Sequence, residues 1–167
     1  SRSFDDAFAS TPRPVFAASS AGLQSKFIKT FNYTGPSSPI VHVESDAQDG
    51  RKIYVDRDAT FTALPANLIG ADWVQIAADD QRYSAVDLIE IAVAPGTVVA
   101  IAHDDRAPLP AWLTRQFTPT ARTLTADGVV MRLFERAMGE GGSLTFGSNT
   151  DGAPVSANHY IVFVSGR

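Results

Sequence analysis

Apolar and polar residues alternate with a period of two along most of the chain. In the segment DLIEIAVA (87–94), every second residue from Ile89 onward is apolar, and TVVAIAH (97–103) repeats the pattern. Successive side chains of a β-strand point to opposite faces of a sheet, so this alternation is typical of strands with one buried face. The Pro95-Gly96 pair between the two segments is a tight-turn signal, and we predict that they form a β-hairpin.

Nine further segments are predicted as strands because they combine this alternation with β-branched and aromatic residues. They are 26–33, 39–45, 51–56, 59–64, 71–77, 122–126, 129–136, 143–148 and 159–165. The turn-forming pairs between them are Gly35-Pro36, Asp49-Gly50, Asp127-Gly128 and Asp151-Gly152. Only LPAWLTRQ (109–116) is predicted as a short helix. The pattern therefore predicts an all-β fold, an antiparallel β-sandwich or jelly roll with one short helix.

The length fits one domain, because 167 residues can bury a single core and are too few for two ordinary domains. Residues 1–25 are rich in Ser, Ala and Pro and show no sustained period. We therefore expect an irregular N-terminal arm followed by one β-sandwich domain over 26–167. The chain starts at Ser1 without a methionine, which we interpret as a processed product or an excised domain.

Composition narrows the classes of partner. With 44% hydrophobic and 19% charged residues, the chain has the composition of a globular protein. A net charge of -4 and a pI near 5.2 argue against a nucleic-acid partner. No apolar run approaches the ~20 residues needed to span a bilayer, so we expect no membrane insertion. The absence of cysteine excludes disulfides, thiolate nucleophiles and sulfur-ligated metals.

The usual catalytic motifs are missing from the sequence. It contains no G-x-S-x-G elbow, no H-E-x-x-H, no P-loop and no Rossmann glycine pattern. The glycine-rich segment 139–147 precedes a predicted strand, which favours a hairpin loop over a phosphate-binding helix start. His42, His103 and His159 lie far apart, on or beside predicted strands, and structural roles are expected for them. We predict no catalytic residue.

Paired aspartates are the candidates for a metal site. Calcium takes several oxygen ligands from carboxylates and loop carbonyls, and Asp79, Asp80 and Asp104 could supply some of them. Aspartates also cap turns by accepting hydrogen bonds from nearby amides, and we favour this interpretation. A structural calcium ion stays open as an alternative, and no other cofactor is expected.

Two arginines stand in similar surroundings. Arg57 and Arg106 each follow an aspartate at the end of a predicted strand, and a Leu-Pro-Ala-x-Leu segment lies a few residues downstream of each. A guanidinium there can tie two loops together through carboxylates or can grip a polar ligand. We favour the structural tie and keep ligand binding as the alternative.

A sugar-binding site needs flat aromatic rings beside polar groups. Trp73 lies among apolar strand residues and is predicted to be buried, Trp112 either plugs the sandwich or lines a site, and Tyr83 lies in a polar stretch. Replacing Trp112 by alanine is expected to remove glycan retention with little change in melting. The residues predicted to lie nearest a bound sugar are Arg106, Asp105, Trp112, Tyr83 and Asn149.

Four stretches resemble the β-sandwich accessory modules of secreted bacterial polysaccharide lyases and glycoside hydrolases. They are YVDRDATFTALPANLIGADWVQIAADD, VVAIAHDDRAPLPAWL, FTPTARTLTADGVVMRLFERAM and GGSLTFGSN. The resemblance implies a secreted, extracellular protein whose module binds carbohydrate or packs against a catalytic domain. Such modules often carry Gly-Gly-Asn where this chain has Gly147-Ser148-Asn149.

Three functions are compared on this basis. The favoured one is a non-catalytic carbohydrate-binding module that targets a polysaccharide-degrading enzyme to its substrate. The alternative is a structural or docking module with no glycan affinity. The third is a small polysaccharide lyase or hydrolase, which requires that a His or Tyr, a carboxylate and an Arg meet in one cleft.

Overall fold

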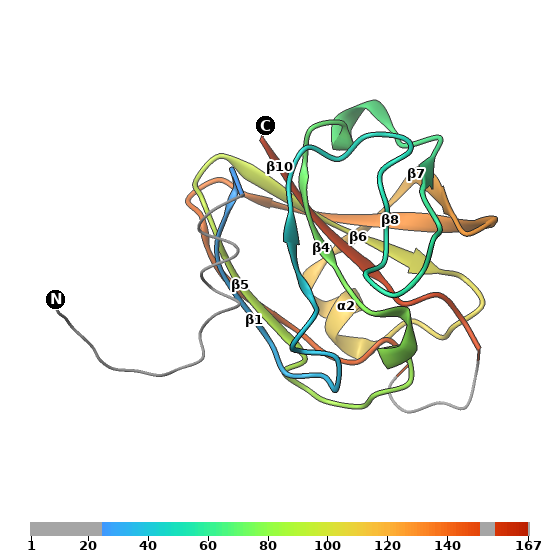
Figure 1. The fold of residues 1–167 in the computed structure, drawn as a ribbon. Helices are drawn as coiled ribbons and strands as arrows, with labels where there is room; N and C mark the ends of the chain where they lie inside the picture. Colours follow the sequence, from blue (N-terminus) through green and yellow to red (C-terminus); the bar gives the residue numbers. More distant parts are fainter. Residues whose placement is uncertain (1–24, 151–155, 167) are drawn as a thin grey trace, which may run out of the picture.

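Two antiparallel sheets form the protein, as a computed structural model describes it for residues 25–150 and 156–166 (Figure 1). The smaller sheet has the order β1 (Ile28–Tyr33), β5 (Ile89–Val93) and β9 (Gly142–Phe146). The larger has the order β2 (His42–Glu44), β4 (Asp72–Gln75), β10 (Ile161–Gly166), β6 (Thr97–Asp104), β8 (Val129–Met138), β7 (Thr118–Ala126) and β3 (Phe61–Thr62). The predicted all-β antiparallel sandwich is confirmed.

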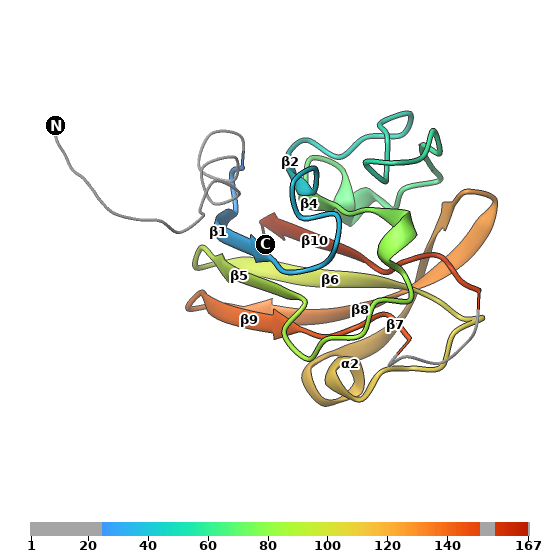
Figure 2. The ribbon, with the colours of Figure 1, turned by 60° about the horizontal axis from the view of Figure 1, so that its bottom comes forward.

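Helical structure is short in the described residues. The helix α2 (Ala111–Gln116) follows β6 and confirms the predicted short helix, and two 3₁₀ turns, η1 (Ala66–Leu68) and η2 (Ala78–Asp80), flank β4. Figure 2 shows α2 close to β7 and β8 and apart from β1. No helix in this part of the chain has the length and hydrophobicity needed to span a bilayer. The expected irregular arm lies outside the described residues, apart from Ser25.

The prediction that 87–94 and 97–103 form a hairpin is wrong. β5 pairs with β1 and β9 in the smaller sheet, whereas β6 pairs with β10 and β8 in the larger one. The Pro95-Gly96 turn, with Gly96 at a φ of 73°, therefore carries the chain from one sheet to the other. The alternation in each segment indicates that one face of the strand is buried in the shared core. It does not indicate which strand is the hydrogen-bonded partner.

A second crossing between the sheets lies beside the first. It joins β8 to β9 through residues 139–141, and the backbone N–H of Gly96 donates a hydrogen bond to the carbonyl oxygen of Gly139 at 3.0 Å. The two crossings thus support one another at the same end of the sandwich. By contrast, β7 and β8 form a true hairpin, because Ala126 pairs with Val129 across the predicted Asp127-Gly128 turn.

The predicted strand 51–56 is also wrong, since this segment forms only an isolated bridge between Lys52 and Thr60. Its apolar residues Ile53 and Tyr54 are nevertheless buried, at 0% and 1% exposure. They fill the core from an irregular loop. The pattern identified buried residues correctly and misassigned their backbone.

Aromatic side chains pack across the larger sheet. Trp73 of β4 lies opposite Phe163 of β10, and the ring of Phe61 contacts both, with centroid distances of 5.3 and 5.6 Å. Such pairs contribute about 0.5–1.5 kcal/mol each beyond the area they bury. They hold β3 and the loops around it over the sheet.

Candidate functional site

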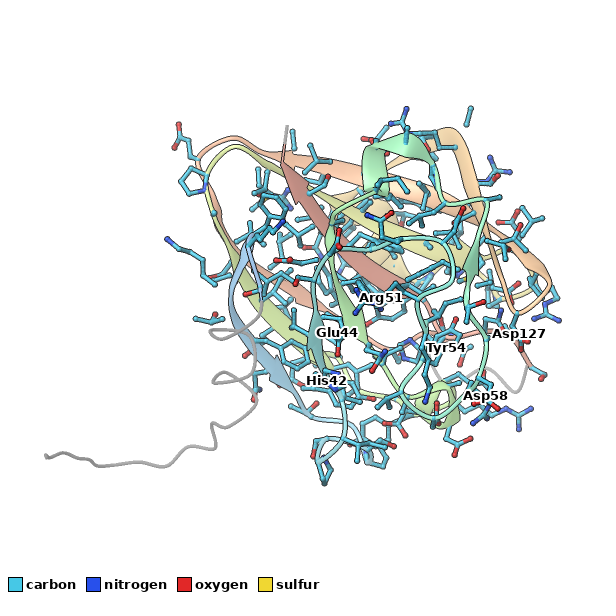
Figure 3. The ribbon with its side chains drawn as sticks, turned by 45° about the horizontal axis from the view of Figure 1, so that its top comes forward. His42, Glu44, Arg51, Tyr54, Asp58 and Asp127 are labelled. Atoms are coloured by element: carbon cyan, nitrogen blue, oxygen red, sulfur yellow. The ribbon has the colours of Figure 1, made fainter. Side chains whose placement is uncertain are left out.

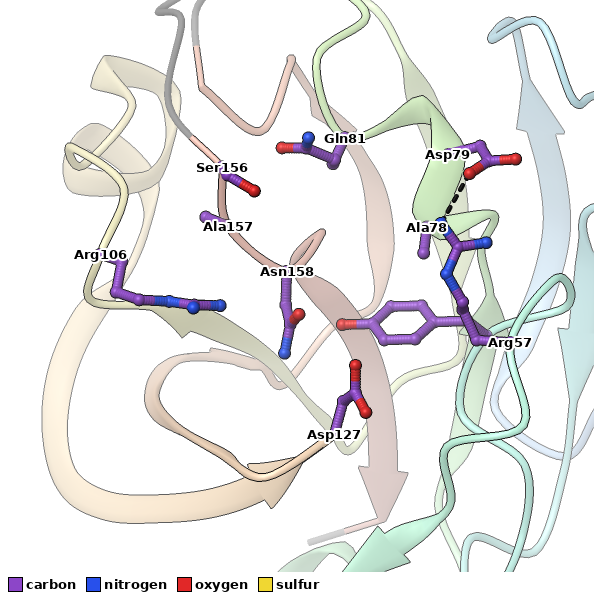
Figure 4. A pocket seen from close by; sticks show the side chains of 10 residues that line it. Arg57, Ala78, Asp79, Gln81, Arg106, Asp127, Ser156, Ala157 and Asn158 are labelled. Carbon is purple, nitrogen blue, oxygen red and sulfur yellow. Dashed lines mark hydrogen bonds and ion pairs between the residues drawn. The ribbon is translucent and has the colours of Figure 1, made fainter.

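A polar cavity of about 240 Å³ lies where several loops converge at one end of the larger sheet (Figure 4). These loops are the segment 54–57, the turn η2, the connection after β6, the β7–β8 turn and the segment before β10. The lining residues are Tyr54, Arg57, Ala78, Asp79, Gln81, Arg106, Asp127, Ser156, Ala157 and Asn158. We call this cavity the arginine pocket.

Arg57 is held on one side of the arginine pocket by two carboxylates. Its Nη2 lies 2.6 Å from Oδ1 of Asp79, and its Nη1 lies 3.3 Å from Oδ2 of Asp56. The hydrogen bond to Asp79 is the main cause of a raised pKa of Arg57. Asp56 also accepts hydrogen bonds from the backbone N–H groups of Ala78 and Asp79, so the same carboxylate fixes η2. The Arg57 side chain remains 44% exposed.

Arg106 lies on the opposite side of the arginine pocket and is anchored to a buried carboxylate (Figure 4). Its Nη2 and Nε donate to Asp104, at 2.7 and 3.1 Å, while 55% of its side chain stays exposed. Burial alone would raise the pKa of Asp104, but hydrogen bonds from Arg106 and from the backbone N–H of Asn158 outweigh it and lower that pKa. Asp104 is therefore an ionised anchor under the loop.

Tyr54 and Asn158 make the floor of the arginine pocket rigid. The buried hydroxyl of Tyr54 donates to the carbonyl oxygen of His159 at 2.7 Å, and burial raises the pKa of Tyr54. Nδ2 of Asn158 donates to the carbonyl oxygen of Ala126 at 3.0 Å. The segment before β10 is thus tied to both the 54–57 loop and the β7–β8 hairpin.

Two polar groups of the arginine pocket have no hydrogen-bond or ion-pair partner among residues 25–150 and 156–166. Asp127 is exposed at a left-handed backbone position, with a φ of 53°, and forms no ion pair within the described residues. Oε1 of Gln81 is buried and accepts no hydrogen bond from any described residue. The pocket therefore offers unused acceptors as well as half-exposed guanidinium groups.

Of the five predicted sugar-contacting residues, only Arg106 lines the arginine pocket. Asp105 lines a different, larger cavity of about 550 Å³, where its carboxylate lies 3.7 Å from Nη2 of Arg132. Tyr83 is 39% exposed and is not among the residues that line these cavities. The predicted residues are thus spread over several surfaces.

Trp112 and Asn149 are buried. Trp112 is 7% exposed, packs against Phe146 and Tyr160, and donates from Nε1 to the carbonyl oxygen of Ser148 at 2.9 Å. It reaches the surface at a third hollow, of about 280 Å³. Asn149 accepts a hydrogen bond from the backbone N–H of Tyr160 at 2.9 Å. Both side chains have structural partners, and their contact with a sugar stays a prediction.

The three candidate metal ligands are each engaged by protein donors. Asp79 pairs with Arg57, Asp104 pairs with Arg106, and Asp80 accepts hydrogen bonds from the hydroxyl of Tyr33 at 2.5 Å and from Ser37. Among residues 25–150 and 156–166, no three His, Asp or Glu side chains gather as a metal site would need. The calcium alternative has no further support here and stays a prediction.

Another ionic group lies over β2 and β4, apart from Tyr54 and Asp127 (Figure 3). Glu44 lies 2.7 Å from Nε2 of His42 and 3.0 Å from Nη2 of Arg51, whose guanidinium lies 5.0 Å from the Trp73 ring centroid. These side chains cover the edge strand β2 with charge, which discourages pairing with another sheet edge.

Sequence reasoning missed most of the arginine pocket. Tyr54 was expected on a strand and Asp127 in a turn, while Gln81 and Asn158 carry no motif. The repeated Asp-Arg pair was the one sequence feature that could have indicated the site, because Arg57 and Arg106 both line this cavity.

Comparisons with known proteins place the chain beside a carbohydrate-active enzyme. No protein-family model matches it. A beta-glucuronidase of Formosa agariphila is 30% identical over 142 residues, which are 84% of this chain and 14% of that protein. A solved structure of a beta-glucuronidase from glycoside hydrolase family 2 superposes with a TM-score of 0.76 and 30% identity, over 81% of this chain and 14% of the other. The chain is therefore homologous to one segment, about a seventh in length, of a glycoside hydrolase family 2 beta-glucuronidase.

Proposed function

We propose that this chain is a non-catalytic, secreted module of a polysaccharide-degrading glycoside hydrolase and that it binds carbohydrate in the arginine pocket. The observation that carries the proposal is the pocket itself, in which guanidinium, carboxylate and amide groups from five loops face one cavity. The match to a small segment of a glycoside hydrolase supports an attached catalytic domain. Binding to the polysaccharide would keep that enzyme near its substrate.

The chemistry of the pocket suits sugar hydroxyls, which both donate and accept hydrogen bonds. The carboxylates of Asp79 and Asp127 accept, and the exposed N–H groups of Arg57 and Arg106 donate. A volume of about 240 Å³ is below the ~300–1,000 Å³ of pockets for drug-sized ligands, so we expect one sugar unit and weak affinity.

Catalysis is the weaker proposal, although Tyr54, Asp127 and two arginines line one cavity. A tyrosine base must lose its proton near neutral pH, whereas burial raises the pKa of Tyr54 and its hydroxyl is committed to the carbonyl oxygen of His159. The phenol is therefore placed as a structural donor.

A docking module is the second candidate, and the 550 Å³ cavity favours it. Leu109, Phe117 and Phe134 line this cavity, and Leu109 is 50% exposed. An apolar hollow of this kind suits contact with another protein domain. This function requires no glycan affinity.

Affinity electrophoresis against neutral and acidic plant and algal polysaccharides tests the proposal, with the Arg57→Gln variant as the site probe. Arg57→Gln removes a pocket-lining donor and is expected to lower retention at least fivefold. Arg122→Gln is the matched control, because Arg122 is similarly exposed, at 48% against 44% for Arg57, and pairs with Glu135 outside the pocket. Absence of retention by every polymer, or equal retention by the two variants, would refute binding at the arginine pocket.

A further inference from the structure

We infer that the arginine pocket recognises an uncharged sugar unit through its hydroxyl groups and disfavours a carboxylate or sulfate ester. This inference rests on the proposed carbohydrate binding and specifies the class of sugar. It follows from the balance of charge in the pocket and from one buried acceptor.

The carboxylates outnumber the guanidinium groups around the cavity. Asp79 and Asp56 neutralise Arg57, and Asp104 neutralises Arg106. Asp127 adds a further negative charge, and its field acts on both arginines. Among the described residues, two positive groups therefore face four negative ones. An anionic ligand would lose its hydration there and would find no cation that lacks a carboxylate partner.

The buried acceptor points to the same class of ligand. Gln81 lines the cavity, and its buried Oε1 has no donor among the described residues, which is unfavourable while it stays unpaired. A sugar hydroxyl can donate to Oε1 of Gln81 and to the carboxylate of Asp127. A uronate carboxylate or a sulfate ester has no proton to donate near neutral pH.

Arg57 and Arg106 can donate hydrogen bonds to a neutral sugar although their charges are balanced by carboxylates. Each guanidinium keeps about half of its side chain exposed, 44% for Arg57 and 55% for Arg106, after its ion pair is made. The remaining N–H groups can donate to hydroxyl or ring oxygens. Because each cation is already matched by a carboxylate, affinity for a neutral sugar should depend little on salt.

The test compares one polymer in two states, a uronic-acid polysaccharide and the same polysaccharide after chemical reduction of its carboxyl groups to alcohols. Isothermal titration calorimetry at low ionic strength measures the affinity of the whole chain for each. We expect the reduced, neutral polymer to bind at least tenfold more tightly than the uronate, with less than a twofold change on adding 0.2 M salt. A neutral glucan and a neutral xylan extend the comparison to other backbones.

Asp127→Asn is the charge probe, because asparagine tolerates the left-handed backbone at this turn. This variant should bind the uronate polymer more tightly, because one repelling charge is removed. The ratio of the two affinities, neutral polymer over uronate, should therefore fall at least threefold. Asp46→Asn is the matched control, since Asp46 also has a positive φ, of 65°, and does not line the pocket. The control should leave both affinities unchanged.

The outcomes separate this inference from the proposed function. Tighter binding of the uronate than of its reduced form, weakened by Arg57→Gln, would overturn the inference and leave carbohydrate binding in place. Binding of no polymer, neutral or charged, would overturn the proposed function and the inference with it.

Discussion

Gly141 lies so close to Val93 that a β-carbon built on Gly141 would be 2.7 Å from the Val93 carbonyl oxygen. The contact joins the β8–β9 crossing to the end of β5, where the chain leaves the smaller sheet. Backbone atoms of two crossings touch here without side chains between them. Because Gly141 also has a φ of 75°, both its space and its backbone conformation require glycine.

Gly141→Ala is therefore expected to destabilise the protein by at least about 2 kcal/mol, from left-handed strain together with the displaced carbonyl. Gly139→Ala is the control, because nothing lies within 4 Å of a β-carbon there and its φ is not in the left-handed region. Urea unfolding measures both. Equal unfolding midpoints for the two variants would contradict this prediction, because they would show that the backbone of the β8–β9 crossing shifts at no cost to make room for the methyl group.

Tyr33→Phe tests the buried hydrogen bond that joins the end of β1 to η2. Removing the hydroxyl leaves the buried carboxylate of Asp80 without one of its donors, and we expect a loss of about 1–2 kcal/mol. Tyr83→Phe removes a hydroxyl from a partly exposed ring and should change the unfolding free energy by less than about 0.5 kcal/mol. Equal losses of unfolding free energy in the two variants would contradict a stabilising role for the Tyr33–Asp80 hydrogen bond.

Trp112→Ala should cost about 3–5 kcal/mol, in place of the small change in melting expected from the sequence, because it empties a buried site between Phe146 and Tyr160. Trp112→Phe keeps most of the packing and removes the hydrogen bond to Ser148, so a smaller loss is expected. Thermal and urea unfolding give both values. An unchanged melting temperature for Trp112→Ala would instead indicate a ring that is available to a ligand.

Acid should destabilise the protein through its buried histidines. Burial lowers the pKa of His159 to about 4 and also lowers that of His103, whereas an unfolded histidine titrates near ~6.5. Between these values the unfolded state binds more protons than the folded state, so stability falls as pH drops from ~6.5 toward 4. For His159 the full loss is about 3 kcal/mol.

His159→Gln is expected to flatten the dependence of the unfolding free energy on pH over this interval, even if it lowers stability at pH 7. His42→Gln, at a partly exposed side chain, serves as the comparison for removing a histidine that is not buried. Urea unfolding at several pH values between 7 and 4.5 gives the curves. A slope unaffected by His159→Gln would assign the acid sensitivity to other groups.

Much of the fold could be predicted from the alternation of residues, because burial on one face is a local property. The segments around β1, β4, β8 and β10 were recognised in this way. Strand pairing could not be predicted, since β5 and β6 are joined by only three residues (94–96) and yet belong to different sheets. A turn such as Pro95-Gly96 fits a hairpin or a crossing between sheets, and the long-range packing decides between them.

The candidate site was predicted less well for a related reason. Arg57 and Arg106 were recognisable by their preceding aspartates, but their meeting at one cavity depends on how distant loops fold over the sheet end. Trp112 has the ring that sugar binding favours, and yet the fold uses it against Phe146. The sequence shows which residues have side chains suited to ligand binding, but it does not show which of them meet at one cavity.

The last strand, β10, lies in the interior of the larger sheet, hydrogen-bonded to β4 on one side and β6 on the other. Two parts of that sheet, β4 and β6, are therefore joined by a strand that follows both of them in sequence. A nascent chain lacking 161–166 would expose two unpaired strand edges, at β4 and at β6. The pairing of the larger sheet is accordingly expected to be complete only when β10 is in place between β4 and β6.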